Sequence, residues 1–325
     1  MTNLRFIFHS GKNPKFIYYG SNYLSMIIPN LFYRHCLSLK LKKARQRVDW
    51  EYIQKRVDYY NKLSVHKTIN EDSPTIGHQY KPNQKVYYLD TRKTLRWFSK
   101  DRHYLLESGD VTYIPKYPSF LKSRPIKGDN ANCILLKLDK VRHFIFLKDN
   151  LKWEDKSNQV IFRGKTTGKN NRLHFMRKFF GNPNFDVGDI SKDSENPAWI
   201  TPKKSLYDHL RYKFIMALEG NDVASNLKWI MGSNSVAVMP EPTYETWFME
   251  GKLIPNYHYI RIKPDFSDLE ERIEYYINHP DEAKAISMHA NEYVKQFFDA
   301  EREEIIEILV ARKYFDYVDI KNPNL

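Results

Sequence analysis

The sequence has little cysteine and lacks a long apolar run. Its 325 residues contain two cysteines, Cys36 and Cys133, so no disulfide framework holds the fold together and a reducing compartment is expected. The most apolar stretch near the N-terminus, 16–32, is broken by glycine, serine, asparagine and proline, and it falls short of the roughly 20 apolar residues of a membrane span. The residues before it lack the features of a secretory signal. We therefore expect a cytoplasmic protein.

The composition is that of a folded protein. Apolar residues make up 42% of the chain and aromatic residues 15%, which excludes an intrinsically disordered chain and is ample for a core. At this length, two domains of ordinary size are expected rather than one.

Positive charge is concentrated in the N-terminal part. The formal net charge is +13, and the first 70 residues alone hold 13 Lys and Arg against three Asp and Glu, or +10. Leu37, Leu41, Ala44 and Val48 recur at helical spacing among basic residues, which predicts a basic amphipathic helix near 36–62. Such a helix packs on its own domain, lies on an anionic membrane or glycolipid surface, or follows a nucleic-acid backbone. We favour the membrane or glycolipid and expect no nucleic-acid partner. The residues expected to make this contact are Lys40, Lys42, Lys43, Arg45 and Arg47.

Strand-like and helix-like segments alternate along the chain. Short strands are expected at 86–89, 111–114 and 144–147, and a strand at 160–162 leads through a polar turn into a helix at 173–180. This alternation predicts an α/β fold with a parallel sheet, and the change of pattern places a domain boundary near 157–158. The later elements expected are helices at 205–218, 226–231, 269–278, 281–298 and 301–314, and strands at 235–239 and 257–262.

Three segments concentrate side chains suited to anions or sugars. The turn IFRGKTTGKNNR precedes a helix, where backbone N–H groups attract phosphate, although it has neither the GxxxxGK[ST] nor the GxGxxG spacing. In 219–229, EGNDVASNLKW, a glycine permits a tight turn, and the polar residues either cap the next helix or hold an anion. In 239–260, carboxylates stand beside tyrosine, tryptophan and histidine, a mixture found both in sugar sites and in cores.

A resemblance to glycosyltransferase family 90 is carried by the FRG turn and three later segments, RYKFIMALEGNDVASNLKWIMGSNSV, YETWFMEGKLIPNYHYIRI and DFSDLEERIEYY. It covers about 85–315 and is greatest to the bacterial, lipopolysaccharide-modifying branch. The resemblance implies a GT-B architecture, with two Rossmann-like domains facing across a cleft, a UDP-sugar donor, and inversion without a metal. The chain also has no Asp-x-Asp pair, which metal-dependent glycosyltransferases use, so no metal or other cofactor is expected.

The resemblance implies a division of the chain and roles for its residues. An acceptor-side domain is expected at 1–157, a donor-binding domain at 158–298, and a C-terminal helix at 299–325 that packs back on the N-terminal domain. The general base of the family corresponds to Asp110, with Asp90 as the rival, although the family's Arg-Asp pair reads Gly109–Asp110 here. The donor-binding residues implied are Arg163, Gly164, Thr166, Thr167, Arg172, Gly220, Asn221, Asp222, Val223, Ala224, Ser225, Lys228, Glu241, Tyr244 and Glu245.

The function expected is an inverting, metal-independent transfer of a hexose or pentose from a UDP-sugar to a lipopolysaccharide or other cell-surface glycan. Asn226 stands near the place of a phosphate-binding arginine of the eukaryotic enzymes, which leaves Lys228 as the nearest cation. This departure favours a cytoplasmic enzyme, peripheral on the inner membrane face. Two alternatives remain: a protein O-glycosyltransferase that transfers glucose or xylose, and a non-catalytic protein that binds membranes or polyanions.

Overall fold

The structure is a computed structural model that describes residues 11–78 and 85–321, and the described chain forms two compact units. We call them unit 1 and unit 2. The chain leaves unit 2 and enters unit 1 between Val141 and Arg142, which precedes the domain boundary expected near 157–158. Two later passages take residues 244–249 and everything after 296 into the second unit. Unit 1 contains 11–14, 142–243 and 250–296, and unit 2 contains 15–141, 244–249 and 297–321.

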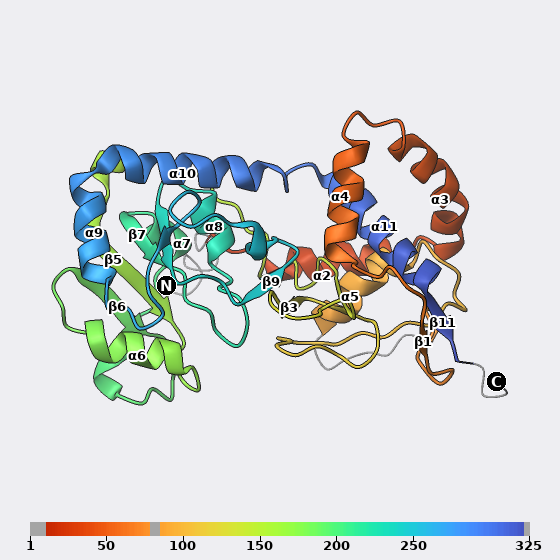
Figure 1. The fold of residues 1–325 in the computed structure, drawn as a ribbon, viewed down its shortest axis with the longest axis horizontal. Helices are drawn as coiled ribbons and strands as arrows, with labels where there is room; N and C mark the ends of the chain where they lie inside the picture. The colour runs from red at the N-terminus through yellow and green to blue at the C-terminus, as the bar shows by residue number, and fades with distance from the viewer. Residues whose placement is uncertain (1–10, 79–84, 322–325) are drawn as a thin grey trace. The chain divides into compact units, whose positions relative to one another are not determined.

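Unit 1 is a five-stranded sheet with helices packed against it (Figure 1). All neighbouring strands in this sheet run parallel. The strands are β5 (Ser157–Gly164), β6 (Phe185–Asp189), β7 (Tyr212–Met216), β8 (Val236–Met239) and β10 (Ile260–Arg261). The helices are α6 (Asn170–Phe179), α7 (Leu206–His209), α8 (Leu227–Met231), α9 (Leu269–Asn278) and α10 (Pro280–Lys295), with short 3-10 turns η1 (Trp153–Asp155), η2 (Pro197–Trp199) and η3 (Glu250–Lys252).

The strand order of unit 1 reverses once. Strand β5 comes first in the chain, β6 pairs with one of its edges, and β7, β8 and β10 follow in turn from the other edge. This is a doubly wound order, and its reversal lies between β5 and β7. The predicted α/β class with a parallel sheet is therefore confirmed for this unit.

The strands of unit 1 are buried on both faces, as parallel strands between helices generally are. Val160, Ile161 and Phe162 of β5 are 0%, 0% and 4% exposed. The ring of Phe162 meets that of Phe175 on α6 at 5.3 Å between centroids, and Phe175 meets Phe266 at 5.4 Å. Each large apolar side chain buried in this way contributes about 1.5–3 kcal/mol. The aromatic layer therefore fixes α6, and with it the loop that precedes α6.

Unit 2 is mainly helical. Helices α4 and α5 pack against α11, and β1 pairs with β11 in parallel. Its helices are α2 (Lys15–Ser25), α3 (Asn30–Ala44), α4 (Trp50–Tyr60), α5 (Lys85–Leu95) and α11 (Ala300–Tyr317). Its strands are β1 (Lys67–Ile69), β2 (Ser119–Leu121), β3 (Ser123–Pro125), β4 (Cys133–Leu135), β9 (Tyr244–Thr246) and β11 (Val318–Ile320).

The strands of unit 2 form three separate pairs: β1 with β11, β2 with β4, and β3 with β9. A Rossmann-like parallel sheet was expected in the N-terminal domain. The described part of unit 2 instead has three two-stranded sheets. Each strand is three residues long, and prolines keep the segment around 115–125 extended and irregular.

A buried carboxylate links distant parts of unit 2. Glu303 of α11 is 2% exposed, accepts a hydrogen bond from Trp247 Nε1 at 2.7 Å, and forms ion pairs with Arg56 and with Lys137, the latter at 3.1 Å. Burial raises the pKa of Glu303, but Lys137 and Arg56 lower it further, so the net direction is downward. These bonds attach α11 to α4 and to the segment after β9.

Most predicted elements of unit 1 are confirmed, and several others are wrong. The predicted strand at 86–89 lies in α5, and 111–114 and 144–147 are irregular. The predicted helix at 205–218 is divided into α7 and strand β7, because 212–216 pairs with β5 and β8. Ser205 does cap α7, in a capping box with Asp208. Local composition was misleading where tertiary pairing or packing decided the structure.

Candidate functional site

The candidate site lies in unit 1, at the carboxyl ends of β5 and β7. In doubly wound sheets, ligands bind outside the carboxyl ends of the strands at the point where the order reverses. Here that point is bordered by the loop 165–169 after β5 and the loop 217–226 after β7. Both loops come from segments that the sequence marked as candidate anion sites.

Arg172 joins these two loops. Its Nη1 donates to the carbonyl of Lys165 at 3.0 Å, its Nη2 to Leu218 at 2.7 Å, and its Nε to Glu219 at 3.1 Å. The neighbouring Asn171 adds a bond from Nδ2 to the carbonyl of Glu219 at 2.9 Å. Burial lowers the pKa of Arg172 to about 10, with Asp189 acting in the opposite direction. The guanidinium group is therefore still charged at neutral pH.

The loop after β7 is shaped for this cation. A Cβ atom placed on Gly220 would lie 3.1 Å from Nη2 of Arg172, so the absence of a side chain permits the close approach. The carboxylate of Glu219 accepts from the N–H of Thr243 at 2.9 Å and from its hydroxyl at 2.5 Å. The loops that follow β5, β7 and β8 are thereby held together.

Thr166 attaches the loop after β5 to the end of β6. It is fully buried, its hydroxyl donates to the carboxylate of Asp189, and its N–H lies 3.2 Å from Ser191 Oγ. Burial raises the pKa of Asp189, but hydrogen bonds from Ser191 and Thr166 outweigh this and lower it. The exposed residues of this loop are Lys165, Thr167 and Gly168, and Gly168 has φ +70°, a backbone conformation that favours glycine.

Comparison with known proteins places the chain in a family. The sequence profile of glycosyl transferase family 90 matches residues 131–306. The chain is also 42% identical to O-glucosyltransferase LpsA of Dichelobacter nodosus over 267 residues, which are 82% of this chain and 84% of that protein. This chain belongs to glycosyl transferase family 90. It is a glycosyltransferase, so the alternative of a non-catalytic binding protein is set aside.

Eukaryotic members are more distant. Protein O-glucosyltransferase 2 of Danio rerio is 26% identical over 151 residues, which are 44% of this chain and 29% of that protein. Protein O-glucosyltransferase 3 of Homo sapiens is 25% identical over 168 residues, which are 50% of this chain and 32% of that protein. The chain thus matches about a third of each of these longer relatives.

Two predicted cations of this family 90 chain are paired with carboxylates. Lys228 is 1% exposed and pairs with Glu250, also 1% exposed, at 2.6 Å. The Arg163 guanidinium pairs with Asp186, which is in register with Ile161, so the side chain extends back along the sheet. Each of these two charges is thus paired with a carboxylate, and the contact of either one with a diphosphate stays a prediction.

The acidic candidates also have partners. Glu241 is exposed and pairs with Arg261 at 3.0 Å. Tyr244 and Glu245 lie on β9 of unit 2, where the 2%-exposed Glu245 pairs with Arg124 at 2.8 Å. Glu245 therefore holds β9 to β3, and its expected part in donor binding stays a prediction.

The rest of the predicted loop divides by burial. Asn221 and Ser225 are exposed and remain able to contact a ligand. Asp222, Val223 and Ala224 are buried and shape the loop from within. Gly164 ends β5 and so positions the loop that follows it.

The two candidate bases differ in accessibility. Asp110 lies in unit 2, its side chain is 27% exposed, and it pairs with the buried ammonium group of Lys122. Asp90 is 1% exposed on α5, where it accepts hydrogen bonds from Tyr18 Oη at 2.7 Å and from the N–H of Lys140 at 3.0 Å. A base must reach an acceptor hydroxyl, so the geometry favours Asp110 over Asp90.

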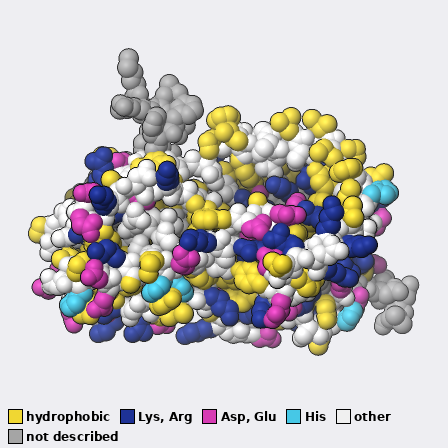
Figure 2. All heavy atoms as spheres, turned by 90° about the horizontal axis from the view of Figure 1, so that it is seen from above, with side chains coloured by type: hydrophobic (Ala, Val, Ile, Leu, Met, Phe, Trp, Pro, Cys, Tyr) yellow, Lys and Arg dark blue, Asp and Glu magenta, His cyan; other side chains and the backbone are white. Residues whose placement is uncertain are grey.

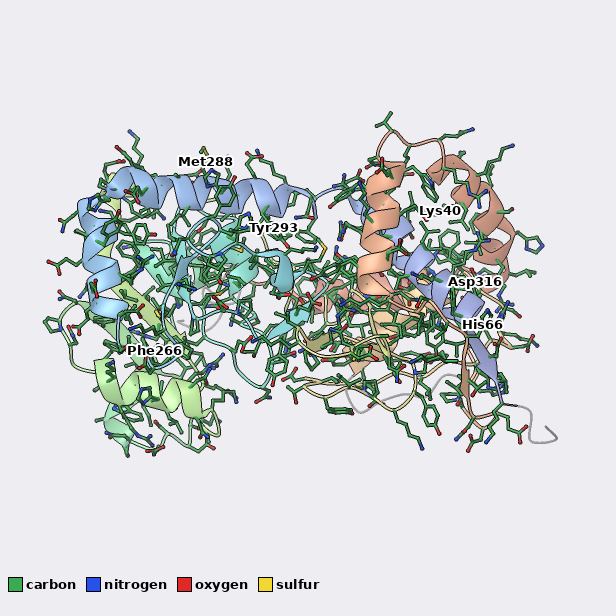
Figure 3. The ribbon with its side chains drawn as sticks, in the orientation of Figure 1. Lys40, His66, Phe266, Met288, Tyr293 and Asp316 are labelled. Atoms are coloured by element: carbon green, nitrogen blue, oxygen red, sulfur yellow. The ribbon has the colours of Figure 1, made fainter. Side chains whose placement is uncertain are left out.

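The basic helix expected near 36–62 is two helices. Helix α3 ends at Ala44, α4 begins at Trp50, and Val48 lies in the exposed turn between them. Lys40 projects from α3 and pairs with Glu304 of α11 at 2.7 Å (Figure 3). Arg47 pairs with Asp299 at 2.6 Å and also contacts Asp49 and Glu301. The predicted residues that stay exposed are Lys42, Lys43 and Arg45.

Several residues that shape the site were missed by the sequence reasoning. Asn171 and Thr243 donate hydrogen bonds to the carbonyl and the carboxylate of Glu219, and these partners are far apart in the chain. Asp189 ends a strand that the sequence pattern did not reveal. Local signals existed only for the segments: Asn171 lies in the polar run around the FRG turn, Glu219 in 219–229 and Thr243 in 239–260.

Proposed function

We propose that this family 90 enzyme transfers glucose from UDP-glucose, with inversion and without a metal, to a hydroxyl group of a lipopolysaccharide or another cell-surface glycan. Its relatives include O-glucosyltransferases, which favours glucose among the hexoses and pentoses. The glycan acceptor follows from the resemblance of the sequence to the bacterial, lipopolysaccharide-modifying branch of the family. The GT-B architecture implied by the family belongs to the same proposal.

The observation that carries the donor assignment is the place of Arg172. Its hydrogen bonds go to the carbonyls of Lys165, Leu218 and Glu219, which position the guanidinium without neutralising its charge. A half-buried cation at the switch point of a doubly wound sheet suits the diphosphate of a nucleotide sugar. The exposed Lys165 and the backbone amides of the loop add positive potential at the same place.

The proposed reaction is a single displacement. The acceptor oxygen bonds to C1 of the glucosyl group as the bond from C1 to the β-phosphate oxygen breaks, and the acceptor proton passes to the carboxylate of Asp110. UDP departs with the electron pair of the broken bond, and Arg172 stabilises the charge that develops on it. The ammonium group of Lys122 pairs with this carboxylate and holds it in position.

A ligand series tests the donor. Thermal unfolding is measured with UDP, UDP-glucose, UDP-xylose, GDP-glucose and TDP-glucose. A donor at 100 times its dissociation constant stabilises the folded state by about 2.7 kcal/mol. We expect the uridine compounds to raise the melting temperature, UDP-glucose included. An absence of stabilisation by every uridine compound would overturn the donor assignment.

An acceptor panel separates the two transfer reactions. The eukaryotic protein O-glucosyltransferases among the relatives make a protein the competing acceptor. We expect radiolabelled glucose to enter truncated lipopolysaccharide cores. Transfer to a protein domain with none to the glycans would establish the alternative.

A further inference from the structure

Helices α2 and α3 expose large apolar side chains. Helix α2 has no buried residue, and α3 buries only Leu41 and Ala44. We name this exposed set, which comes from the consecutive helices α2 and α3 and the turn between them, the apolar hairpin face. It consists of Phe16 (69% exposed), Leu24 (66%), Ile27 (75%), Leu31 (59%), Phe32 (60%) and Leu39 (55%). Figure 2 shows hydrophobic side chains gathered along the upper edge of the part of the molecule that holds these helices. Contiguous apolar surface of this kind marks an interaction site.

The side of α2 and α3 that lies away from the apolar hairpin face is anchored to the rest of unit 2. Tyr18 of α2 donates to Asp90 at 2.7 Å, and Arg96 donates to the carbonyl of Ser25 at 3.3 Å. Tyr33 of α3 lies under the Arg96 guanidinium at 3.7 Å and against the Trp97 ring at 5.0 Å. The apolar hairpin face is therefore the outer side of an anchored element.

The charge of the hairpin is of one sign. Residues 11–48 contain eight Lys and Arg and no Asp or Glu. Lys15 at the start of α2, Lys42 and Lys43 near the end of α3, and Arg45 just after it are exposed. An apolar face bordered by cations, with no acidic residue in the same segment, complements an anionic lipid surface.

We propose that the apolar hairpin face inserts into the interfacial region of an anionic membrane, while Lys15, Lys42, Lys43 and Arg45 contact lipid head groups. Among residues 11–78 and 85–321, no helix is long and apolar enough to cross a membrane. The hairpin then lies in the membrane plane at shallow depth. This replaces the single basic amphipathic helix expected from the sequence near 36–62, because Lys40 and Arg47 are engaged within unit 2. The inference goes beyond the transfer reaction and holds whichever sugar is transferred.

Co-sedimentation of the full chain with vesicles tests insertion. The vesicles are phosphatidylglycerol with phosphatidylethanolamine, or phosphatidylcholine alone. Leu24→Ser/Ile27→Ser/Phe32→Ser is compared with Ile200→Ser/Ile254→Ser/Met288→Ser, which changes exposed apolar residues of unit 1 (47%, 53% and 58% exposed; Met288 in Figure 3). We expect the hairpin variant to lose at least about tenfold in binding to anionic vesicles and the control variant to bind like the unaltered chain.

The charge requirement is tested with Lys42→Gln/Lys43→Gln/Arg45→Gln. We expect this variant to lose at least about tenfold in binding to anionic vesicles and to lose the preference for anionic over neutral lipid. Melting temperature and UDP-glucose binding in the absence of lipid are expected to be unchanged, so failure of membrane docking is distinguishable from failure of the donor assignment.

Two results would overturn the proposal. The first is vesicle binding by the hairpin variant equal to that of the unaltered chain. The second is that the unaltered chain does not bind vesicles but self-associates in sedimentation velocity, and that the hairpin substitutions abolish this self-association. That result would assign the face to a second copy of the chain. An environment-sensitive fluorophore at position 27, introduced by Ile27→Cys with Cys36→Ser, is expected to shift to shorter emission wavelength on vesicles.

Discussion

Arg172 and Glu219 are joined by a hydrogen bond from Nε of the arginine to the backbone carbonyl of the glutamate at 3.1 Å. The carboxylate of the same glutamate accepts from Thr243 Oγ1 at 2.5 Å. Glu219 lies in the loop after β7. Through these two bonds it connects α6, which follows β5, with the loop that follows β8. The guanidinium is held by a network, so its position depends on its fork-shaped donor geometry as well as on its charge.

Arg172→Lys is expected to weaken donor binding. Lysine keeps the positive charge but cannot donate to Lys165, Leu218 and Glu219 together. Loss of a hydrogen bond to a charged group costs about 1.5–3 kcal/mol, so the dissociation constant for UDP should rise by roughly 10- to 150-fold. Isothermal titration calorimetry measures it. Arg177→Lys, at an exposed position of the same helix, is the matched control and should bind UDP like the parent. Equal affinity in the Arg172 variant would remove this residue from the donor site.

Asp110→Asn is expected to abolish most turnover and leave the donor bound. A positioned general base contributes about 10²- to 10⁴-fold, so kcat should fall within that range while the dissociation constant for UDP-glucose stays the same. The measurement pairs radiolabelled transfer with calorimetry. Asp129→Asn, an exposed carboxylate of the same unit, serves as the control. Retention of turnover to within a few-fold would place the base elsewhere.

Lys228→Met is expected to destabilise the fold. The change leaves the buried carboxylate of Glu250 without the ammonium group 2.6 Å away. Breaking a buried ion pair by removal of one partner costs about 3–5 kcal/mol, so the free energy of unfolding should fall by about that amount. Urea denaturation measures the change. The double variant Lys228→Met/Glu250→Gln should recover most of that loss and bind UDP normally. If the double variant were stable but unable to bind UDP, Lys228 would contact the donor after all.

Asp90 should make stability depend on pH. Burial raises its pKa from the ordinary value of 3.8 to about 6, despite opposing contributions from Lys140 and Tyr18. Between these pH values the folded state binds the proton more tightly than the unfolded state, so the contribution of Asp90 to the free energy of unfolding falls as pH rises from about 4 to 6. The full difference is about 3 kcal/mol.

Asp90→Asn isolates this contribution. Asparagine does not titrate, so the unfolding free energy of the parent minus that of the variant should decrease by about 2.4 kcal/mol from pH 4 to pH 7, as followed by urea denaturation. The lost acceptor for Tyr18 adds a pH-independent offset. A difference that stays constant with pH would contradict the raised pKa.

Much of unit 1 could be predicted because its signals are local. The apolar run at 160–162 and the polar turn after it predicted β5, the loop and α6, and the helices from 269 onward follow their periodicity. Strand β7 was read as helix because its identity depends on pairing with β5 and β8. Helix α5 was read as a strand because its Val and Tyr residues favour strands in isolation.

The site could be predicted in place but not in detail. The sequence marked the two loops and Arg172, because glycines and cations beside a strand end are visible without coordinates. It could not show that Lys228 and Glu245 are neutralised, since their partners Glu250 and Arg124 are 22 and 121 residues away. The sequence alone does not show whether a charged side chain faces solvent or a buried counter-ion.

The interleaving of the two units has a consequence for biosynthesis. Unit 2 needs α11 and β11, which pair with α4 and β1, yet these follow the whole of unit 1 in the chain. During synthesis on the ribosome, residues 15–141 emerge first. The core of unit 2 cannot be completed until residues 297–321 have also been synthesised. The exposed hairpin of α2 and α3 is therefore available to a membrane or a chaperone while the remaining part of its own unit is still being synthesised.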